Sequence, residues 1–265
     1  MHRRGREFFF QVVALLLALI AVHALYVTLI RPNAELIERR AAERAAAEGT
    51  AYQPPRSLYV VLKDFEQEAA IVLALWALAV LAYKTRATLA ERRLLERPLL
   101  PLAEGLRVLP EDVPPLLRGL EELSEEEREA LPVRVLVVAL TRFQVTRDVR
   151  AAEEAVDALC EAEGDRRDAE LSLIRYITWA IPSIGFIGTV RGIGDALGQA
   201  HQAMQGDIAG VTASLGVAFN STFVALVVSM FVMFFLHQLQ LLEERLVLDA
   251  RERCDRSLLR HLEPL

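Results

Sequence analysis

The 265-residue sequence contains none of the short motifs that mark common enzyme classes. It has no HExxH, GxSxG or GxxxxGK[ST] pattern and no paired-cysteine metal pattern, so the common hydrolase, NTPase and zinc-binding classes have no support. The alternative of an intramembrane enzyme rests only on His23 and scattered serines. We therefore expect a protein that is not an enzyme and that holds no metal ion and no cofactor.

The chain also has only two cysteines and no excess of basic residues. The two cysteines, Cys160 and Cys254, fit neither a metal knuckle nor a redox motif, and we interpret them as free structural thiols. The formal net charge is −6 and the pI is about 5.5, whereas nucleic-acid-binding domains usually present a basic face and a pI above roughly 9. We therefore expect no nucleic-acid partner.

Apolar residues are abundant, at 53% of the chain, and the mean hydropathy is +0.28 although 25% of the residues are charged. Such a composition requires apolar and charged residues to be segregated along the chain, which excludes a disordered tail, a collagen or a disulfide scaffold. It predicts an all-α integral membrane protein with four transmembrane helices and long helical cytoplasmic extensions.

The first two predicted spans differ in length. Residues 8–30 are 23 residues without a formal charge, enough to cross the hydrocarbon core as a helix. Three arginines before this run and a Val22-His23-Ala24 triplet resemble a signal peptide, but the apolar run continues past the triplet, so we expect the helix to be retained. Residues 69–83 are 15 apolar residues, which span if their flanking side chains reach the interface.

The third and fourth predicted spans carry small and polar residues. The third begins near Tyr176 and is interrupted by Pro182, several glycines and the pair Arg191 and Asp195, whereas residues 211–236 carry no formal charge. Both are long enough to span, and their small residues suit close approach of helices rather than contact with lipid.

The distribution of Lys and Arg predicts the topology. The loop between the third and fourth spans lacks both residue types and is placed outside, which puts the middle segment and both termini in the cytoplasm; the six basic residues of 31–68 disagree with an outside position for that loop. The predicted segments are 1–30, cytoplasmic N-terminus and first transmembrane helix; 31–68, external loop; 69–84, second transmembrane helix; 85–172, cytoplasmic helical domain; 173–237, third and fourth transmembrane helices forming the channel core; and 238–265, cytoplasmic C-terminal helix.

Outside the spans, local signals predict further helices. We expect an exposed helix over 33–49 with Asn33 as its N-cap, a capping box formed by Ser124 and Glu127, and one long helix from Pro132 to Glu170. The fourth span has no stop signal, so it should continue into the cytoplasm as one helix of nearly 50 residues and pack on that long helix.

Small residues and hydroxyls recur at helical spacing in the last two spans. Thr189 and Thr222 lie about nine and eleven residues from the outer ends of their spans, roughly 13–17 Å deep and level with each other near the bilayer midplane. Two hydroxyls at one depth suit a narrow polar path, whereas the alternative is that each threonine bonds back to a carbonyl one turn earlier. The predicted channel lining is Thr189, Thr222, Ser221 and Asn220, and the predicted close-packing positions are Pro182, Gly185, Gly188, Gly192, Ala218 and Ala225.

Two stretches carry a family resemblance. Residues 181–194, IPSIGFIGTVRGIG, and residues 215–227, LGVAFNSTFVALV, resemble the MotA/TolQ/ExbB proton-channel family. The resemblance implies a homopentamer in the bacterial inner membrane around a dimer of a single-span, ExbD/TolR/MotB-like protein whose helix carries an aspartate. It also implies that Thr189 and Thr222 face that aspartate and that proton flow past it drives mechanical work.

Two positions depart from the family pattern. Val217 stands where TolQ and ExbB carry a glutamate, and Arg191 stands where they usually carry tryptophan, which leaves the exit route of the proton unassigned. Arg191 either pairs with Asp195 at i, i+4 or acts in partner docking or gating. His23, a titratable group in the first span, is expected to have a hydrogen-bonded packing role.

The sequence thus supports two functions. The first is an ion-conducting, in particular proton-conducting, subunit of a membrane motor that couples the proton-motive force to mechanical work through its single-span partner. The second, motivated by the missing glutamate, is a non-conducting membrane scaffold that gathers soluble partners through its cytoplasmic helices.

Overall fold

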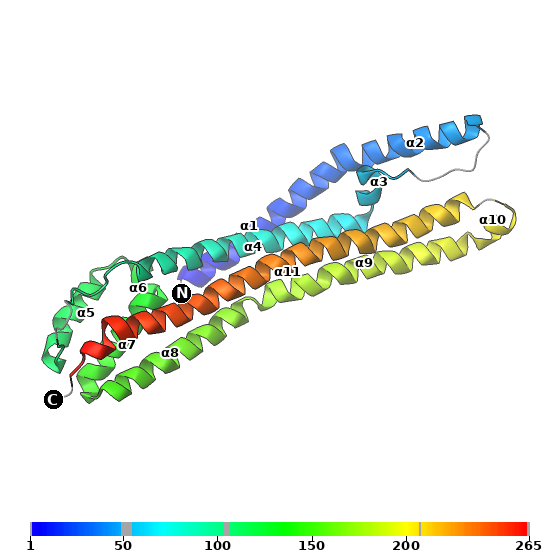
Figure 1. Ribbon diagram of the computed structural model, residues 1–265. Coiled ribbons are helices and arrows are strands. Elements are labelled where there is room, and N and C mark those ends of the chain that lie inside the picture. Colours follow the sequence, from blue (N-terminus) through cyan, green and yellow to red (C-terminus); the bar gives the residue numbers. More distant parts are fainter. Residues whose placement is uncertain (1, 49–54, 103–106, 207, 264–265) are drawn as a thin grey trace. The chain divides into compact units, whose positions relative to one another are not determined.

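The computed structural model describes residues 2–48, 55–102, 107–206 and 208–263 (Figure 1). Over these residues the predicted all-helical fold is confirmed, since the β-structure they contain is one isolated bridge between Val108 and Leu262. Four helical segments are long and apolar enough to cross a membrane. The elements are α1 (His2–Leu25), η1 (Tyr26–Ile30), α2 (Arg31–Glu48), α3 (Leu58–Leu62), α4 (Phe65–Leu95), η2 (Pro110–Asp112), α5 (Val113–Glu121), α6 (Glu125–Glu129), α7 (Leu131–Thr146), α8 (Val149–Glu170), α9 (Ser172–Gly198), α10 (Ala200–Met204), α11 (Ala209–Ser257) and η3 (Leu259–His261).

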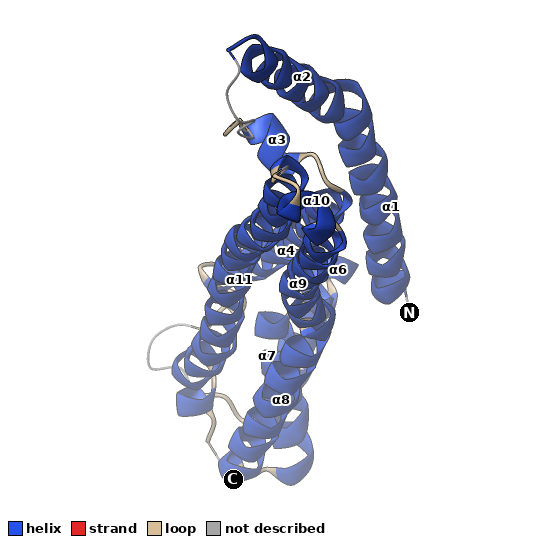
Figure 2. Cartoon of the chain, turned by 90° about the vertical axis from the view of Figure 1, so that its right-hand side faces the viewer, coloured by secondary structure: helices blue, strands red, loops and turns tan. Residues whose placement is uncertain are grey.

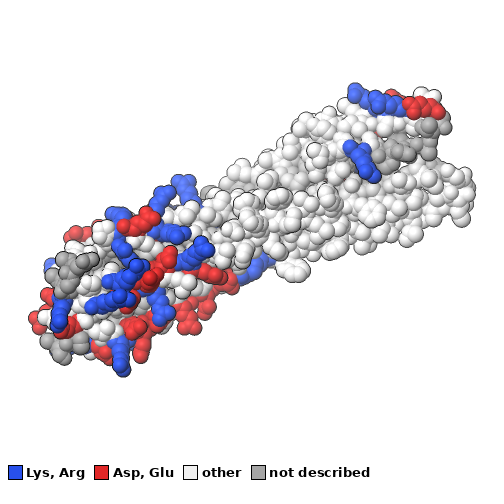
Figure 3. Space-filling model, viewed as in Figure 1, with Lys and Arg blue, Asp and Glu red and all other residues white. Residues whose placement is uncertain are grey.

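The chain forms two compact units, one of residues 1–81 and 173–236 and the other of residues 82–172 and 237–265. In the first unit, α9 and α11 run side by side in both views (Figures 1 and 2). The visible surface of this unit is mostly uncharged (Figure 3), and it exposes large apolar side chains such as Trp179 at 74% and Val190 at 73%. A surface of this kind needs lipid or another protein to cover it.

The first helix continues where the sequence predicted a break. α1, the π-helical turn η1 and α2 follow one another without interruption, and Arg31 at their junction keeps helical angles of φ −63° and ψ −46°. The prediction of Asn33 as an N-cap is therefore wrong. Its Nδ2 instead donates a hydrogen bond of 2.7 Å to the carbonyl oxygen of Leu29, within a helix that already exists. The predicted end of this helix at Gly49 lies outside the described residues.

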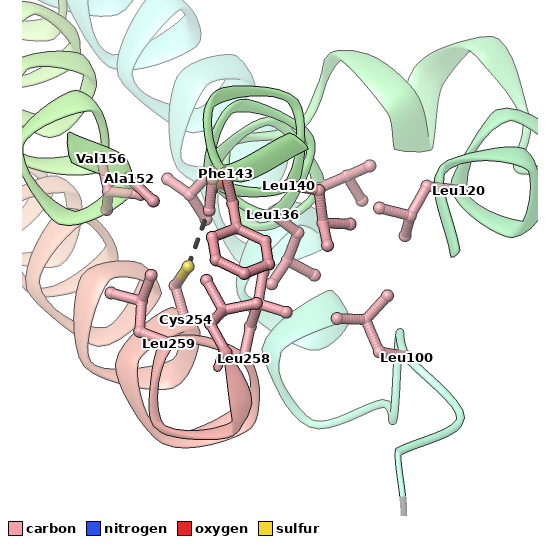
Figure 4. Packing of buried hydrophobic residues seen from close by; sticks show 14 of the residues in the cluster. Leu100, Leu120, Leu136, Leu140, Phe143, Ala152, Val156, Cys254, Leu258 and Leu259 are labelled. Carbon is pink, nitrogen blue, oxygen red and sulfur yellow. Dashed lines mark hydrogen bonds between the residues drawn. The ribbon is translucent and has the colours of Figure 1, made fainter. Parts of the chain in front are cut away.

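The second unit has a core of aliphatic side chains around α7 (Figure 4). Phe143 of α7 is fully buried, and Leu120 of α5, Val156 of α8 and Leu258 at the end of α11 belong to the same cluster. Both cysteines are buried and free, as predicted, and Cys254 contacts the carbonyl oxygen of Val135 with its sulfur at 4.0 Å.

The middle segment contains two helices where the sequence predicted one. Arg147 takes a left-handed conformation with φ 56°, which ends α7, and the Asp148 side chain accepts a hydrogen bond of 2.9 Å from the backbone N–H of Arg150, which starts α8. No glycine or proline marks this turn, so the prediction of one helix from Pro132 to Glu170 is wrong. Packing of α7 against α8 stabilises a turn that local propensity does not favour.

Two other local predictions are confirmed. The Ser124 hydroxyl accepts a hydrogen bond of 3.3 Å from the Glu127 N–H, and the Glu127 carboxylate accepts one of 3.2 Å from the Ser124 N–H, which is a complete capping box. Hydrogen bonds from Ser124 and from Arg97 hold the pKa of Glu127 below its usual range. The helix that carries the fourth span is continuous over the 49 residues of α11.

A buried charge network joins three helices of the second unit. Arg167 of α8 donates from Nη2 to Glu91 of α4 at 2.6 Å and from Nε to Glu163 at 3.0 Å. Arg134 of α7 also binds Glu163, at 2.9 Å. Burial of these charges is tolerated because each has an opposite charge within hydrogen-bonding distance.

Replacing Arg167 with methionine is expected to lower the free energy of unfolding by about 3 kcal/mol, because two buried carboxylates lose a shared cation. The measurement is denaturant or thermal unfolding of the purified protein. The matched control is Arg251→Met, since Arg251 is 52% exposed in its pair with Asp157 and should contribute at most about 1 kcal/mol. Equal shifts for the two variants would contradict the assigned role of the buried network.

Candidate functional site

Helices α9 and α11 meet at three glycines. A Cβ atom added at Gly185 would lie 2.6 Å from Cβ of Ala225, and one added at Gly192 would lie 2.7 Å from the backbone nitrogen of Ala218. At Gly188 the added atom would lie 2.3 Å from the Ser221 hydroxyl oxygen. Glycine at these positions therefore lets the two helices approach closely.

This close approach brings three hydroxyl groups together, and we call Thr189, Ser221 and Thr222 the hydroxyl cluster. The hydroxyls of Thr189 and Thr222 share a hydrogen bond. The carbonyl oxygen of Gly185 accepts from Thr222 at 3.0 Å, from Thr189 at 3.3 Å and from Ser221 at 3.4 Å. That of Ala218 accepts from Ser221 at 3.0 Å and from Thr189 at 3.2 Å.

The hydroxyl cluster contains more hydrogen-bond acceptors than hydrogens that its hydroxyls can donate. Each hydroxyl has one hydrogen, while two carbonyl oxygens and the hydroxyl oxygens all serve as acceptors. The hydroxyls can therefore exchange partners while each keeps a hydrogen bond. Thr189 bonds back one turn to the carbonyl oxygen of Gly185, which was the second alternative, and it also reaches across to that of Ala218 on α11; the polar path stays a prediction.

The remaining predicted lining residues differ in exposure. Thr189 and Thr222 are half-buried, so part of each remains accessible to another protein. Asn220 is also half-buried, whereas Ser221 is only 1% exposed because α9 covers it at Gly188. Pro182 lies within α9, which continues through it.

The hydroxyl cluster lies close to the N-terminal turn of α4. A Cβ atom at Gly188 would lie 3.1 Å from Cγ of Glu66, and Glu66 belongs to the first turn of α4. From Gly188, α9 continues for ten residues, about 15 Å, to its end at Gly198. The expected depth of the threonines near the bilayer midplane stays a prediction.

Arg191 makes its principal contact with Glu66. Its Nε and Nη2 donate to the two carboxylate oxygens at 2.8 and 2.9 Å, a bidentate pair between α9 and α4. The expected pairing with Asp195 is present as a longer contact of 3.9 Å. No local pattern pairs Glu66 with Arg191, because the two residues lie 125 positions apart along the chain.

The position of Arg191 also bears on its proposed docking role. It follows Thr189 by two residues, which places the two side chains about 200° apart around α9. Arg191 therefore lies on the side of α9 that meets α4, away from the exposed edge of Thr189. This arrangement supports a link between helices rather than contact with a partner at the threonines.

His23 links α1 to α4. Its Nδ1 lies 2.7 Å from a carboxylate oxygen of Glu68, and Arg31 also donates to Glu68. The expected hydrogen bond is present, but the side chain is 62% exposed and is not packed in a core. His23 thus belongs to a polar cluster at the C-terminal end of α1 and the N-terminal end of α4.

A comparison with protein families finds one match. The model described as the MotA/TolQ/ExbB proton channel family matches residues 127–252, from α6 into α11, and includes the hydroxyl cluster. The predicted resemblance is confirmed over this segment. No curated protein and no solved structure matches the chain.

Proposed function

We propose that this chain, whose residues 127–252 match the model of the MotA/TolQ/ExbB proton channel family, is an ion-conducting, stator-like subunit of a motor in the bacterial cytoplasmic membrane. The proton-motive force supplies the energy. A single-span partner supplies an intramembrane aspartate and transmits the mechanical work. The hydroxyl cluster is the observation that carries this proposal.

The hydroxyl cluster suits contact with a carboxyl group. A threonine hydroxyl donates a hydrogen bond to a carboxylate and accepts one from a carboxylic acid, so Thr189 and Thr222 can bind the partner's aspartate in either protonation state. Their exchangeable bonds to the carbonyl oxygens of Gly185 and Ala218 allow this change without stranding a buried polar group. Neutral groups also avoid placing a permanent charge in the ion path.

The assembly that we propose is a homopentamer around a dimer of the partner. Exposed apolar side chains of the first unit, including Phe219 at 70%, need lipid or neighbouring subunits around them. The second unit carries many charged side chains on its visible surface (Figure 3), which suits the aqueous cytoplasm. Together with the lack of Lys and Arg in the loop between the third and fourth spans, this supports a topology with both termini in the cytoplasm.

The test begins with the gene next to the one that encodes this chain, which we expect to encode a single-span protein. The two proteins are purified as a complex and reconstituted into liposomes, and proton uptake is measured under an imposed membrane potential. We expect uptake that requires both proteins and a carboxyl group in the partner's span. A partner without such a group, or uptake equal to that of empty liposomes, would favour the non-conducting scaffold.

A further inference from the structure

Three helices meet at one point of the first unit. A Cβ atom at Gly188 of α9 would touch the Ser221 hydroxyl of α11 at 2.3 Å and Cγ of Glu66 of α4 at 3.1 Å. The absence of a side chain at Gly188 thus lets Glu66 and Ser221 approach the same point on α9 from two different helices. Ser221 in turn shares the Gly185 carbonyl oxygen with Thr189 and Thr222.

We propose that Glu66 is the protonatable group through which this chain delivers protons to the hydroxyl cluster, with Arg191 as its counter-charge. This inference rests on the proposed function and assigns to α4 a step of the same ion path. Glu66 lies outside the segment that matches the family model, which begins at residue 127.

A carboxyl group has a role that the hydroxyls cannot fill. A hydroxyl passes a proton on only when it accepts one at the same time, whereas a carboxylate holds a proton between two transfers. The fourth span has no acidic residue between 211 and 236, so it supplies no such group itself. Glu66 is the carboxyl-bearing side chain that borders, together with Ser221, the space beside Gly188.

The surroundings of Glu66 suit an ionised resting state. Its side chain is 10% exposed, and a buried carboxylate at the edge of a membrane is costly without a counter-charge. Arg191 offsets that cost through two hydrogen bonds of 2.8 and 2.9 Å. The other charged groups near this pair are Asp195 of α9, 3.9 Å from Arg191, and Asp64 and Lys63 between α3 and α4.

The transfer conserves charge at each step. A proton from the outer solution binds a carboxylate oxygen of Glu66, which becomes neutral, and Arg191 keeps Asp195 as an acceptor. Glu66 then gives up the proton beside the hydroxyl cluster, and the partner's carboxylate, which hydrogen-bonds to the hydroxyls of Thr189 and Thr222, accepts it and becomes neutral. Glu66 is ionised again and re-forms its pair with Arg191.

The alternative is that the pair of Glu66 and Arg191 only holds α4 against α9 and takes no part in proton transfer. Moving the carboxyl group to another helix distinguishes proton transfer from this structural role. Val217 lies one turn before Ser221 on the same face of α11, so a glutamate at position 217 can reach Ser221 from another helix without making the α4 to α9 pair. It is also the position at which TolQ and ExbB carry glutamate.

The experiment measures partner-dependent proton uptake in liposomes for wild type and for Glu66→Gln, and it checks assembly of the complex by size-exclusion chromatography. We expect an intact complex and at least a tenfold loss of uptake in Glu66→Gln. Adding Val217→Glu to that variant should restore part of the uptake, and adding Val217→Gln should not. Glu66→Asp should retain uptake with a shifted pH midpoint.

Three results would overturn the proposed role of Glu66. Wild-type uptake in Glu66→Gln, together with loss of uptake in Thr189→Val, would overturn the role of Glu66 and leave the proposed function standing. No uptake by the wild-type complex would overturn both. If Glu66→Gln fails to assemble, the double variant Glu66→Gln/Arg191→Gln keeps two hydrogen-bonding side chains without the buried charges, and wild-type uptake in that variant would equally overturn the inference.

Discussion

Valine at position 189 or at position 222 is expected to reduce partner-dependent proton uptake by at least an order of magnitude while the complex still assembles. Valine has nearly the shape of threonine but has no hydroxyl, so it removes a donor and an acceptor that would face the partner's carboxyl group. In each single variant Ser221 and the remaining threonine together still donate to the carbonyl oxygens of Gly185 and Ala218, so neither loses its hydroxyl donor. The measurement is proton uptake by reconstituted complexes.

Two controls accompany this prediction. Thr212→Val removes an exposed hydroxyl of α11 that bonds back to Ile208 outside the hydroxyl cluster, and it should leave uptake unchanged. Thr189→Ser returns a hydroxyl to the cluster and should recover much of the lost activity. Normal uptake in both Thr189→Val and Thr222→Val would remove the hydroxyl cluster from the ion path.

Alanine at position 192 is expected to force α9 and α11 apart and to destabilise the protein. The added Cβ would lie 2.7 Å from the carbonyl oxygen of Ser214 and 2.7 Å from the backbone nitrogen of Ala218. Backbone atoms of a packed helix cannot move aside as a flexible side chain does, so α9 and α11 must separate. We expect a loss of about 1–3 kcal/mol in the free energy of unfolding, seen as a lower Tm in detergent.

The matched control for this substitution is two residues away on the same helix. A Cβ atom at Gly194 meets no atom within 4 Å, so Gly194→Ala should be neutral or should raise stability by up to about 1 kcal/mol through helix propensity. Separation of the helices also moves Thr189 from Thr222, so Gly192→Ala should reduce proton uptake as well. Equal Tm values for the two alanine variants would contradict the close packing of α9 on α11.

Features set by neighbouring residues could be predicted from the sequence. The apolar runs identified the four candidate spans because crossing a membrane requires length and uncharged side chains in one continuous segment. The helical period placed Thr189 and Thr222 on faces that meet, and the capping box at Ser124 and Glu127 was visible because both residues belong to one turn.

Only the tertiary structure decided the features that depend on distant partners. Arg191 and Glu66 are 125 residues apart, and Arg167 and Glu91 are 76 apart, so no local pattern pairs them. The turn at Arg147 exists because α7 and α8 pack on each other, and the helix through Ile30 continues where a polar cap was expected. The sequence by itself determined which segments are helical enough and apolar enough to span a membrane, because those properties are local. The structure decided which charges and hydroxyls meet, because that depends on how the helices pack.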